Sequence, residues 1–318
     1  MGKWAKIAVI GAVPVIGLGG LAAVPGTASA LPHAAALTGL TTNVATTAHC
    51  WSTRNPTLAK KLSSDIYAAS RKAAGSISIA VYDRKRGISC YINSGKHYDS
   101  ASTIKATVLA AVLRRAQEQH RGLTAWEKSQ AVPMITRSDN DATTRLWKSL
   151  GMTRVRNFLK LAGMTHTTLN SGGAWGLTQE TAYDELKLLK LLTTHGSVLT
   201  DASRAYELKL MNQVISSQRW GTPAGHPSGI VVHVKNGWLP RSTHAWRVHS
   251  LGTFTGRGQD YQMAILTWGD STMSKGIASI ERVARVVHRD LNPGATFAAE
   301  RPLLAPPIDQ TPDEPQIP

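Results

Sequence analysis

Three short motifs along the chain place hydroxyl groups and lysines in a pattern that suits nucleophilic catalysis. In the first, Ser102 and Lys105 are three residues apart at the start of a helical pattern, so the lysine lies on the same helix face within reach of the hydroxyl group. Backbone N–H groups and the positive dipole end of such a helix stabilise an alkoxide or an oxyanion. The pattern favours attack by a lysine-activated serine on a carbonyl carbon, with a capping serine and a solvated lysine as the alternative.

The second and third motifs add polar groups at two later places in the chain. Ser-Asp-Asn at residues 138–140 lies between two predicted helices and can face a cleft, and an ordinary helix cap is the alternative. Lys-Asn-Gly at residues 235–237 is predicted to end an apolar strand, where the glycine lets a ligand approach the rim of the sheet closely. A charged strand end followed by a turn glycine is the alternative there. Each motif is short, so the elements that position them decide their meaning.

The elements around the motifs predict an α/β (α+β) domain. Two strands precede the first motif, three follow the helical middle of the chain, and a last helix ends the domain. This order implies one antiparallel five-stranded sheet covered by helices, with an all-helical lobe inserted and a cleft between the two. The predicted helices cover residues 58–73, 103–119, 126–135, 141–150, 155–161, 180–192 and 274–291, and the strands 76–82, 88–92, 230–234, 245–254 and 261–268.

In this order and in these settings, the three motifs resemble those of the penicillin-recognising serine enzymes, the class A β-lactamases and D,D-peptidases. The resemblance extends from about Leu58 to Leu291. It implies that Ser102 is the nucleophile and that Lys105 accepts its proton. Ser138 would pass a proton to the leaving nitrogen, while Lys235 holds that hydroxyl group.

The same resemblance assigns substrate contacts. Asn140 would hydrogen-bond the amide side chain of the substrate, and Asn236 and Gly237 would line the binding site. The backbone N–H groups of Ser102 and Trp238 would form the oxyanion hole, where losing one donor typically costs about 3–4 kcal/mol of barrier. Asp139 is expected to be structural.

The chain departs from the class A pattern at several positions. Class A enzymes use an Ω-loop glutamate to activate the deacylating water, and this chain has none. His166 stands where an alternative alignment would put that acid, and Glu180 is expected to be a charge in the first turn of a helix. Asn236 replaces the usual threonine, and Arg247 is the candidate for holding a substrate carboxylate, with a surface arginine as its alternative.

Composition and charge limit the class of protein. The 318 residues carry 36 Lys and Arg against 20 Asp and Glu, a net charge of +16, and 42% are hydrophobic. These values exclude a disordered chain, a multi-span membrane protein and a disulfide-stapled miniprotein. No basic run alternates with aromatic residues, so nucleic acid is not an expected partner. Anionic cell-wall polymers are a better match for the charge.

The N-terminus predicts export. Lys3 and Lys6 precede an apolar run over residues 7–24, and Ala-Ser-Ala at 28–30 suits cleavage after Ala30. Glycines and Pro14 make this run a poor membrane anchor. The expected organisation is a signal peptide at 1–30, a linker at 31–50, the serine hydrolase domain at 51–292 and a proline-rich tail at 293–318.

The two cysteines and the expected partners complete the hypothesis. In an oxidising compartment Cys50 and Cys90 are expected to pair, which would contribute about 3–4 kcal/mol, and two free buried thiols are the alternative. We expect a secreted, monomeric hydrolase without metal or cofactor that forms an acyl-enzyme with a β-lactam or a cell-wall peptide. A D,D-carboxypeptidase or esterase, or a non-catalytic wall-binding module, remain the alternative functions.

Overall fold

The computed structural model describes residues 48–298. The predicted signal peptide, nearly all of the predicted linker and the tail after residue 298 lie outside the described residues. Within residues 48–298, no helix is both long enough and apolar enough to span a membrane.

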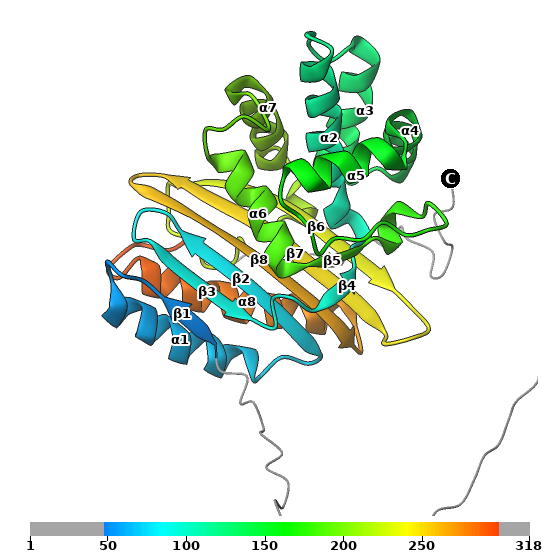
Figure 1. Ribbon diagram of the computed structural model, residues 1–318. Helices are drawn as coiled ribbons and strands as arrows, with labels where there is room; N and C mark the ends of the chain where they lie inside the picture. The colour runs from blue at the N-terminus through cyan, green and yellow to red at the C-terminus, as the bar shows by residue number, and fades with distance from the viewer. Residues whose placement is uncertain (1–47, 299–318) are drawn as a thin grey trace, which may run out of the picture. The chain divides into compact units, whose positions relative to one another are not determined.

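The centre of the structure is an antiparallel sheet with the strand order β1-β3-β2-β8-β7-β6 (Figure 1). Strands from the start of the domain (β1 to β3) and from its end (β6 to β8) join where β2 pairs with β8, so the two ends of the domain meet in one sheet, as the sequence predicts. A separate pair, β4 with β5, flanks the turn at residues 101–103. The strands are β1 His49–Trp51, β2 Ser76–Asp83, β3 Ile88–Ile92, β4 His97–Asp99, β5 Gln179–Thr181, β6 Val231–Pro240, β7 Trp246–Gly256 and β8 Gln259–Asp270.

The sheet has six strands where the sequence predicts five. The additional strand is β1, which lies at the end of the predicted linker and pairs with β3, with Cys50 opposite Cys90. These two cysteines form a disulfide. A strand of three residues is too short to show an alternating pattern, and its position follows from the covalent link and the edge of β3.

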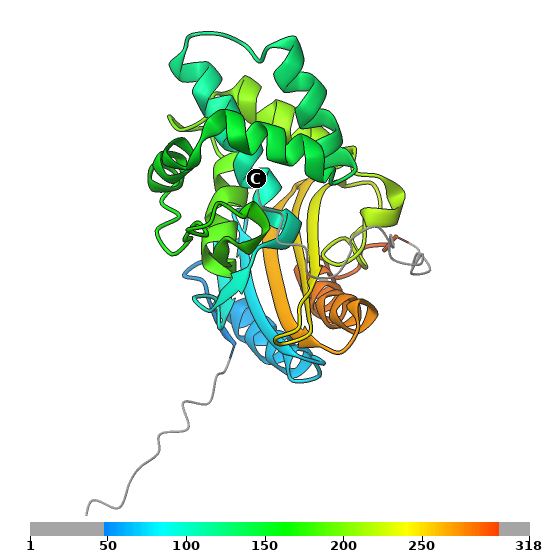
Figure 2. The ribbon, with the colours of Figure 1, turned by 90° about the vertical axis from the view of Figure 1, so that its right-hand side faces the viewer.

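Helices cover both faces of the sheet, and each face has its own apolar core. Along β2, Ile77, Ile79 and Val81 face the core shared with α1 and α8, while Ala80 faces the core shared with the helical lobe. Figure 2 shows the lobe over one face and α8 on the other. The helices are α1 Pro56–Ser70, α2 Ile104–Glu118, α3 Ala125–Thr136, α4 Asn140–Leu150, α5 Met152–Leu161, α6 Ala182–Thr193, α7 Asp201–Asn212 and α8 Met273–Leu291.

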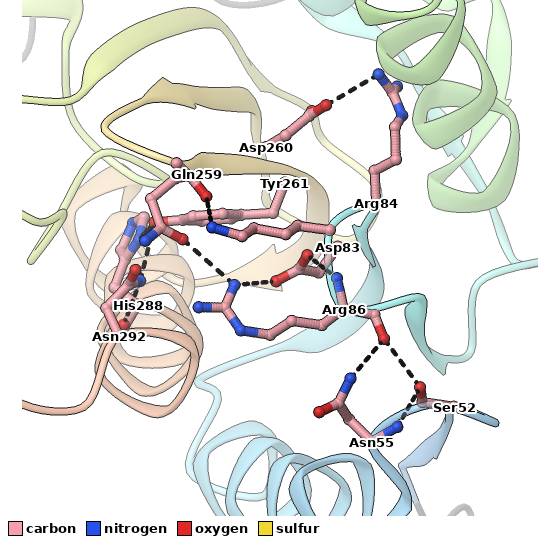
Figure 3. Close-up of polar contacts among 12 residues, drawn as sticks. Ser52, Asn55, Asp83, Arg84, Arg86, Gln259, Asp260, Tyr261, His288 and Asn292 are labelled. Carbon is pink, nitrogen blue, oxygen red and sulfur yellow. Dashed lines mark hydrogen bonds and ion pairs between the residues drawn. The ribbon is translucent and has the colours of Figure 1, made fainter.

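Polar contacts fasten the turn between β2 and β3 to the segment that leads into α1 (Figure 3). The Arg86 guanidinium donates to the buried carboxylate of Asp83 at 2.6 Å, and its backbone carbonyl accepts from Ser52 Oγ and Asn55 Nδ2, both at 3.0 Å. The turn therefore holds the start of the domain against this end of the sheet.

Two parts of the fold differ from the sequence prediction in ways that affect the site. Strand β6 runs on to Pro240, so Lys235 and Gly237 lie in the middle of a strand and not at its end. Glu180 lies in β5 and not in the first turn of a helix. Helix α7 has no counterpart among the predicted elements, because its charged residues mask the apolar positions that face the lobe.

Candidate active site

Ser102 projects from a tight turn that leads directly into a helix. The turn is a short 3-10 helix over Ala101–Thr103, and α2 begins at Ile104. Ala101 has a φ of 49°, a left-handed conformation that costs energy for a residue with a β-carbon. The backbone N–H of Ser100 donates to the Thr178 carbonyl at 2.8 Å, which fixes the turn from outside. A strained, externally held turn of this kind is typical of a functional site.

Lys105 follows one turn later and is completely buried. Its Nζ lies 2.6 Å from the Ser138 carbonyl oxygen, 3.1 Å from Ser138 Oγ and 2.7 Å from Asn140 Oδ1. Burial, and then the nearby charge of Lys235, hold the pKa of Lys105 well below its usual value of 10.5. This amine therefore has access to its neutral form, which can accept a proton.

Ser138 lies at the junction of α3 and α4 and joins the two lysines. Its φ is 60°, a second strained conformation at the site. Its Oγ lies 3.0 Å from Lys235 Nζ as well as 3.1 Å from Lys105 Nζ. The next residue, Asp139, caps α4 by accepting from the backbone N–H of Ala142, which agrees with its expected structural role. The cap fixes the direction in which the neighbouring Ser138 side chain points.

Strand β6 brings Lys235 and Gly237 against the nucleophile turn. Lys235 is almost fully buried, and burial lowers its pKa to about 7. A β-carbon on Gly237 would lie 2.8 Å from the Thr103 nitrogen and 2.9 Å from the Ser102 nitrogen, too close for any other residue. The glycine is needed because the strand approaches the backbone of the turn itself.

Three of these side chains form a hydrogen-bonded chain, in which Ser138 lies between Lys105 and Lys235. Within residues 48–298, Ser102 Oγ makes no hydrogen bond, and Lys105 and Lys235 both bond to Ser138. Ser102 is only 2% exposed. The arrangement offers a nucleophilic hydroxyl, a neutral amine as base and a serine that can return the proton. In the same residues, no group of three or more His, Cys, Asp or Glu side chains could hold a metal ion.

Three residues predicted to contact substrate have other partners. The Asn236 side chain donates to the carbonyls of Gln218 and Trp220 at 2.8 and 3.0 Å and is buried. The Trp238 ring packs edge-on against Trp220, so only its backbone is available to a ligand. Arg247 is buried and pairs with Asp99 at 3.0 Å, so its guanidinium already has a carboxylate partner, and its predicted role toward a substrate carboxylate stays a prediction.

A tryptophan that sequence reasoning missed covers Lys105. The ring of Trp175 has its centre 4.8 Å from Lys105 Nζ, and its Nε1 donates to Thr144 Oγ1 at 3.2 Å. Trp175 is 2% exposed and begins the short 3-10 turn Trp175–Leu177. In the described part of the chain, no carboxylate hydrogen-bonds to Ser102, Lys105, Ser138 or Lys235. His166 is half exposed and faces Asp184 at 3.5 Å, with no contact to these residues.

Glu180 is fully buried beside the nucleophile turn. Its Oε1 lies 2.6 Å from Thr103 Oγ1, and Thr103 directly follows Ser102. The expectation of an exposed helix charge is therefore wrong, because the short pairing of β5 with β4 carries the residue under α2. Helix α6 begins only after its cap, Thr181, which accepts from the backbone N–H of Asp184, so Glu180 precedes the helix.

Comparisons with known proteins agree with this geometry. A family model described as "Beta-lactamase enzyme family" matches residues 59–126 and 128–291. A search of curated proteins finds no match.

Solved structures share the fold at low sequence identity. The TLA-3 extended-spectrum β-lactamase is 17% identical with a TM-score of 0.65, and covers 73% of this chain and 98% of its own. A class A β-lactamase representative from Bacteroides cellulosilyticus DSM 14838 is 16% identical with a TM-score of 0.64 and the same coverage. A variant of the last common ancestor of Gram-negative class A β-lactamases is 21% identical with a TM-score of 0.60, and covers 71% of this chain and 97% of its own.

Proposed function

The chain belongs to the β-lactamase enzyme family, and on that premise we propose that it is a secreted serine hydrolase that forms an acyl-enzyme at Ser102. One observation carries the proposal. Lys105 and Lys235 both approach Ser138 Oγ to about 3 Å in a buried setting. Two ammonium charges so close together in a low-dielectric environment repel each other, so at least one amine is neutral and able to act as a base.

The reaction begins when Ser102 Oγ attacks a carbonyl carbon of the substrate. The serine proton passes to the neutral amine of Lys105, and the carbonyl oxygen becomes an oxyanion held by the backbone N–H groups of Ser102 and Trp238. The C–N bond then breaks. Ser138 gives its proton to the leaving nitrogen and regains one from the lysines beside it. The products of this half are the acyl-enzyme and a free amine.

The proposed substrate is a β-lactam or a peptide of cell-wall type. The family assignment supports a small carbonyl substrate, and the solved structures with this fold are titled as β-lactamases. Asn140 lies at the edge of the site with its Oδ1 on Lys105, so its amide nitrogen is left to bind a substrate carbonyl. Asn236 and Gly237 shape the site from β6 through the backbone.

We propose that the acyl-enzyme is long-lived. Trp175 puts an apolar ring beside Lys105, and no carboxylate is bonded to the catalytic groups in residues 48–298. Without a carboxylate base, the attacking water in deacylation must be activated by Lys105 with Ser138. A D,D-carboxypeptidase or esterase would use the same two groups for both steps, and that is the second candidate function.

Labelling with a fluorescent penicillin tests the proposed function. The wild type should become covalently labelled, and the mass increase should map to the peptide that contains Ser102. Ser102→Ala should not label, whereas Ser216→Ala, at a 3-10 turn outside the catalytic site, should label normally. Equal labelling of wild type and Ser102→Ala would contradict the nucleophile assignment. Unlabelled wild type that also hydrolyses no ester, but binds peptidoglycan, would favour a non-catalytic wall-binding module.

Export and wall association are part of the proposal. The disulfide between Cys50 and Cys90 suits an oxidising compartment. Removing the two lysines of the signal peptide leaves a net charge of +14 for attraction to anionic wall polymers. Sedimentation with purified cell walls should weaken as salt rises, and salt-insensitive binding would contradict this role for the charge.

A further inference from the structure

A group of buried acids lies behind the nucleophile turn. Glu180, Glu185 and Glu207 come from β5, α6 and α7, and all three are completely buried. Thr103 points toward Glu180, and Lys105 points to the other side, because residues two positions apart on a helix face nearly opposite directions. Ser102 therefore has lysines in front of it and carboxyl groups behind it.

The two contacts of the Thr103 hydroxyl group favour a neutral Glu180. Thr103 Oγ1 is within hydrogen-bond distance of both the Ser100 carbonyl oxygen and Glu180 Oε1. A hydroxyl group has one proton, and a carbonyl oxygen can only accept. If Thr103 donates to Ser100, the proton in its contact with Glu180 must come from Glu180. The arrangement satisfies both contacts only when Glu180 is a neutral carboxylic acid that donates to Thr103.

We propose that Glu180 is a positioning residue for Ser102, because its protonated carboxyl group holds Thr103 and, through Thr103, the strained turn that presents the nucleophile. The turn needs such support. Ala101 is left-handed, and Ser100 is held by the Thr178 carbonyl on one side and by Thr103 on the other. Loss of the Thr103 side-chain contact would leave that end of the turn held only by the bond from the Thr103 N–H to the Ser100 carbonyl, while the sheet stays intact. The inference rests on the proposed function and adds regulation of the same site.

The surroundings of Glu180 keep it neutral at low and neutral pH and make it sensitive to alkali. Burial first, and the charge of Glu185 second, raise the pKa of Glu180 well above its usual value, and burial raises the pKa of Glu185 to about 8. The ionisable groups that face this pair are Asp184 on α6, Glu207 on α7 and Tyr98 on β4. No lysine or arginine bonds to Glu180 or Glu185 in the described residues. Ionisation of the pair removes the donor to Thr103 without any cation to replace it.

Four variants test the proposal, with the rate of labelling by fluorescent penicillin as the measurement. Glu180→Leu removes the donor and should slow acylation about 10- to 100-fold. Glu180→Gln keeps a donor and should retain most of the rate at pH 7 and, unlike the wild type, hold it as the pH rises above 8. Thr103→Val should slow acylation as Glu180→Leu does, and the double variant should be no slower than either. Glu207→Gln, a matched buried acid without contact to Thr103, should acylate as the wild type does.

The outcomes separate this inference from the proposed function. Wild-type acylation in folded Glu180→Leu, additive losses in the double variant, or equal damage in Glu180→Gln and Glu180→Leu would each overturn the positioning role. If the wild type reacts with neither penicillin nor a fluorophosphonate, the proposed function fails instead. Hydrogen exchange of the Ser102 and Thr103 amides then decides the inference. Exchange should speed up in Thr103→Val and stay unchanged in Glu207→Gln, and unchanged exchange in Thr103→Val would overturn it.

Discussion

The two sides of the nucleophile turn are buried to the same degree and carry opposite kinds of ionisable group. In front of Ser102, Lys105 and Lys235 surround Ser138. Behind it, Glu180 lies against Thr103 with Glu185 as its neighbour. Burial lowers the pKa of the lysines and raises the pKa of the glutamates, so both sides tend toward neutral groups near pH 7.

The difference lies in what each neutral group can do. A neutral lysine is a proton acceptor, which is what a nucleophilic serine needs beside it. A neutral glutamic acid is a hydrogen-bond donor, which is what a strained backbone turn needs behind it. Burial therefore favours a proton acceptor on the lysine side and a hydrogen-bond donor to the turn on the glutamate side. Changes of pH and single substitutions should act on the two sides in different ways.

The largest expected effect comes from the lysine side. Lys105→Met keeps the length of the side chain but removes the base, so acylation should slow by about 10³-fold. Penicillin labelling over time measures the rate. Lys96→Met, at an exposed lysine whose Nζ contacts Ser76, is the control and should acylate normally. Rapid acylation of Lys105→Met would show that the proton goes elsewhere.

The pH dependence of acylation tests the neutrality of the lysine side. Lys235 takes up a proton as the pH falls through its pKa of about 7, and the base is lost when Lys105, whose pKa burial also lowers, becomes protonated in turn. The rate should therefore fall as pH drops from 7 to 5, approaching about tenfold per pH unit. The measurement is the labelling rate at saturating penicillin across this range. A flat profile down to pH 5 would mean that the base is not one of these lysines.

The free energy of unfolding should fall as the pH rises because of the buried acids, whereas the acylation rate should rise with pH. In the folded state Glu185 keeps its proton to a pKa of about 8, while in the unfolded chain it ionises near 4.5. The folded state thus binds more protons between these values, and stability falls as pH rises through this window. Glu185→Gln removes this loss, so its advantage over wild type should grow by on the order of 2–4 kcal/mol between pH 5 and 8.

Urea unfolding at several pH values measures this advantage. Asp141→Asn, at an exposed acid, should leave the pH profile unchanged. If Glu185→Gln follows the wild-type profile in parallel, the acid is not held neutral by burial.

The smallest expected effect concerns Trp175. Trp175→Leu keeps an apolar side chain but opens space beside Lys105 for water, so deacylation should speed up by about 3- to 10-fold while acylation changes less. The decay of the penicillin adduct measures this rate. Trp126→Leu, at an exposed tryptophan on α3, is the control. If the adduct decays at the same rate or more slowly in Trp175→Leu, the Trp175 ring is not what makes the acyl-enzyme long-lived.

The residues on the lysine side of the turn were predicted from the sequence, and those on the acid side were not. Ser102 and Lys105 are three residues apart where a turn leads into α2, and Ser138 and Lys235 belong to short motifs that the local pattern predicts at the ends of elements. Glu180 gives no such signal, because a glutamate before a helical pattern is usually an exposed charge. Its burial depends on the pairing of β4 with β5, residues about 80 positions apart.

The structure differs from the sequence prediction at two further places, again because of contacts between distant parts of the chain. Arg247 and Asp99 come from distant parts of the chain, and their ion pair cannot be read from either neighbourhood. Strand β6 passes through Lys235 to Pro240 because β7 continues to pair with it, with Gly237 opposite His249. The local pattern ended this strand at its last apolar residue. In both cases, tertiary pairing overrides the local pattern.

The disulfide also determines how the domain carries mechanical load. Chain tension applied at Ala48 reaches β1 first, and Cys50 is bonded to Cys90 in β3. Once the few hydrogen bonds of β1 have broken, the force passes through the disulfide into β3. Helix α1 lies between the two cysteines in the chain and does not carry this force. A domain held by its N-terminal segment against a surface would therefore keep α1, β2 and the nucleophile turn unloaded until β3 itself is pulled from the sheet.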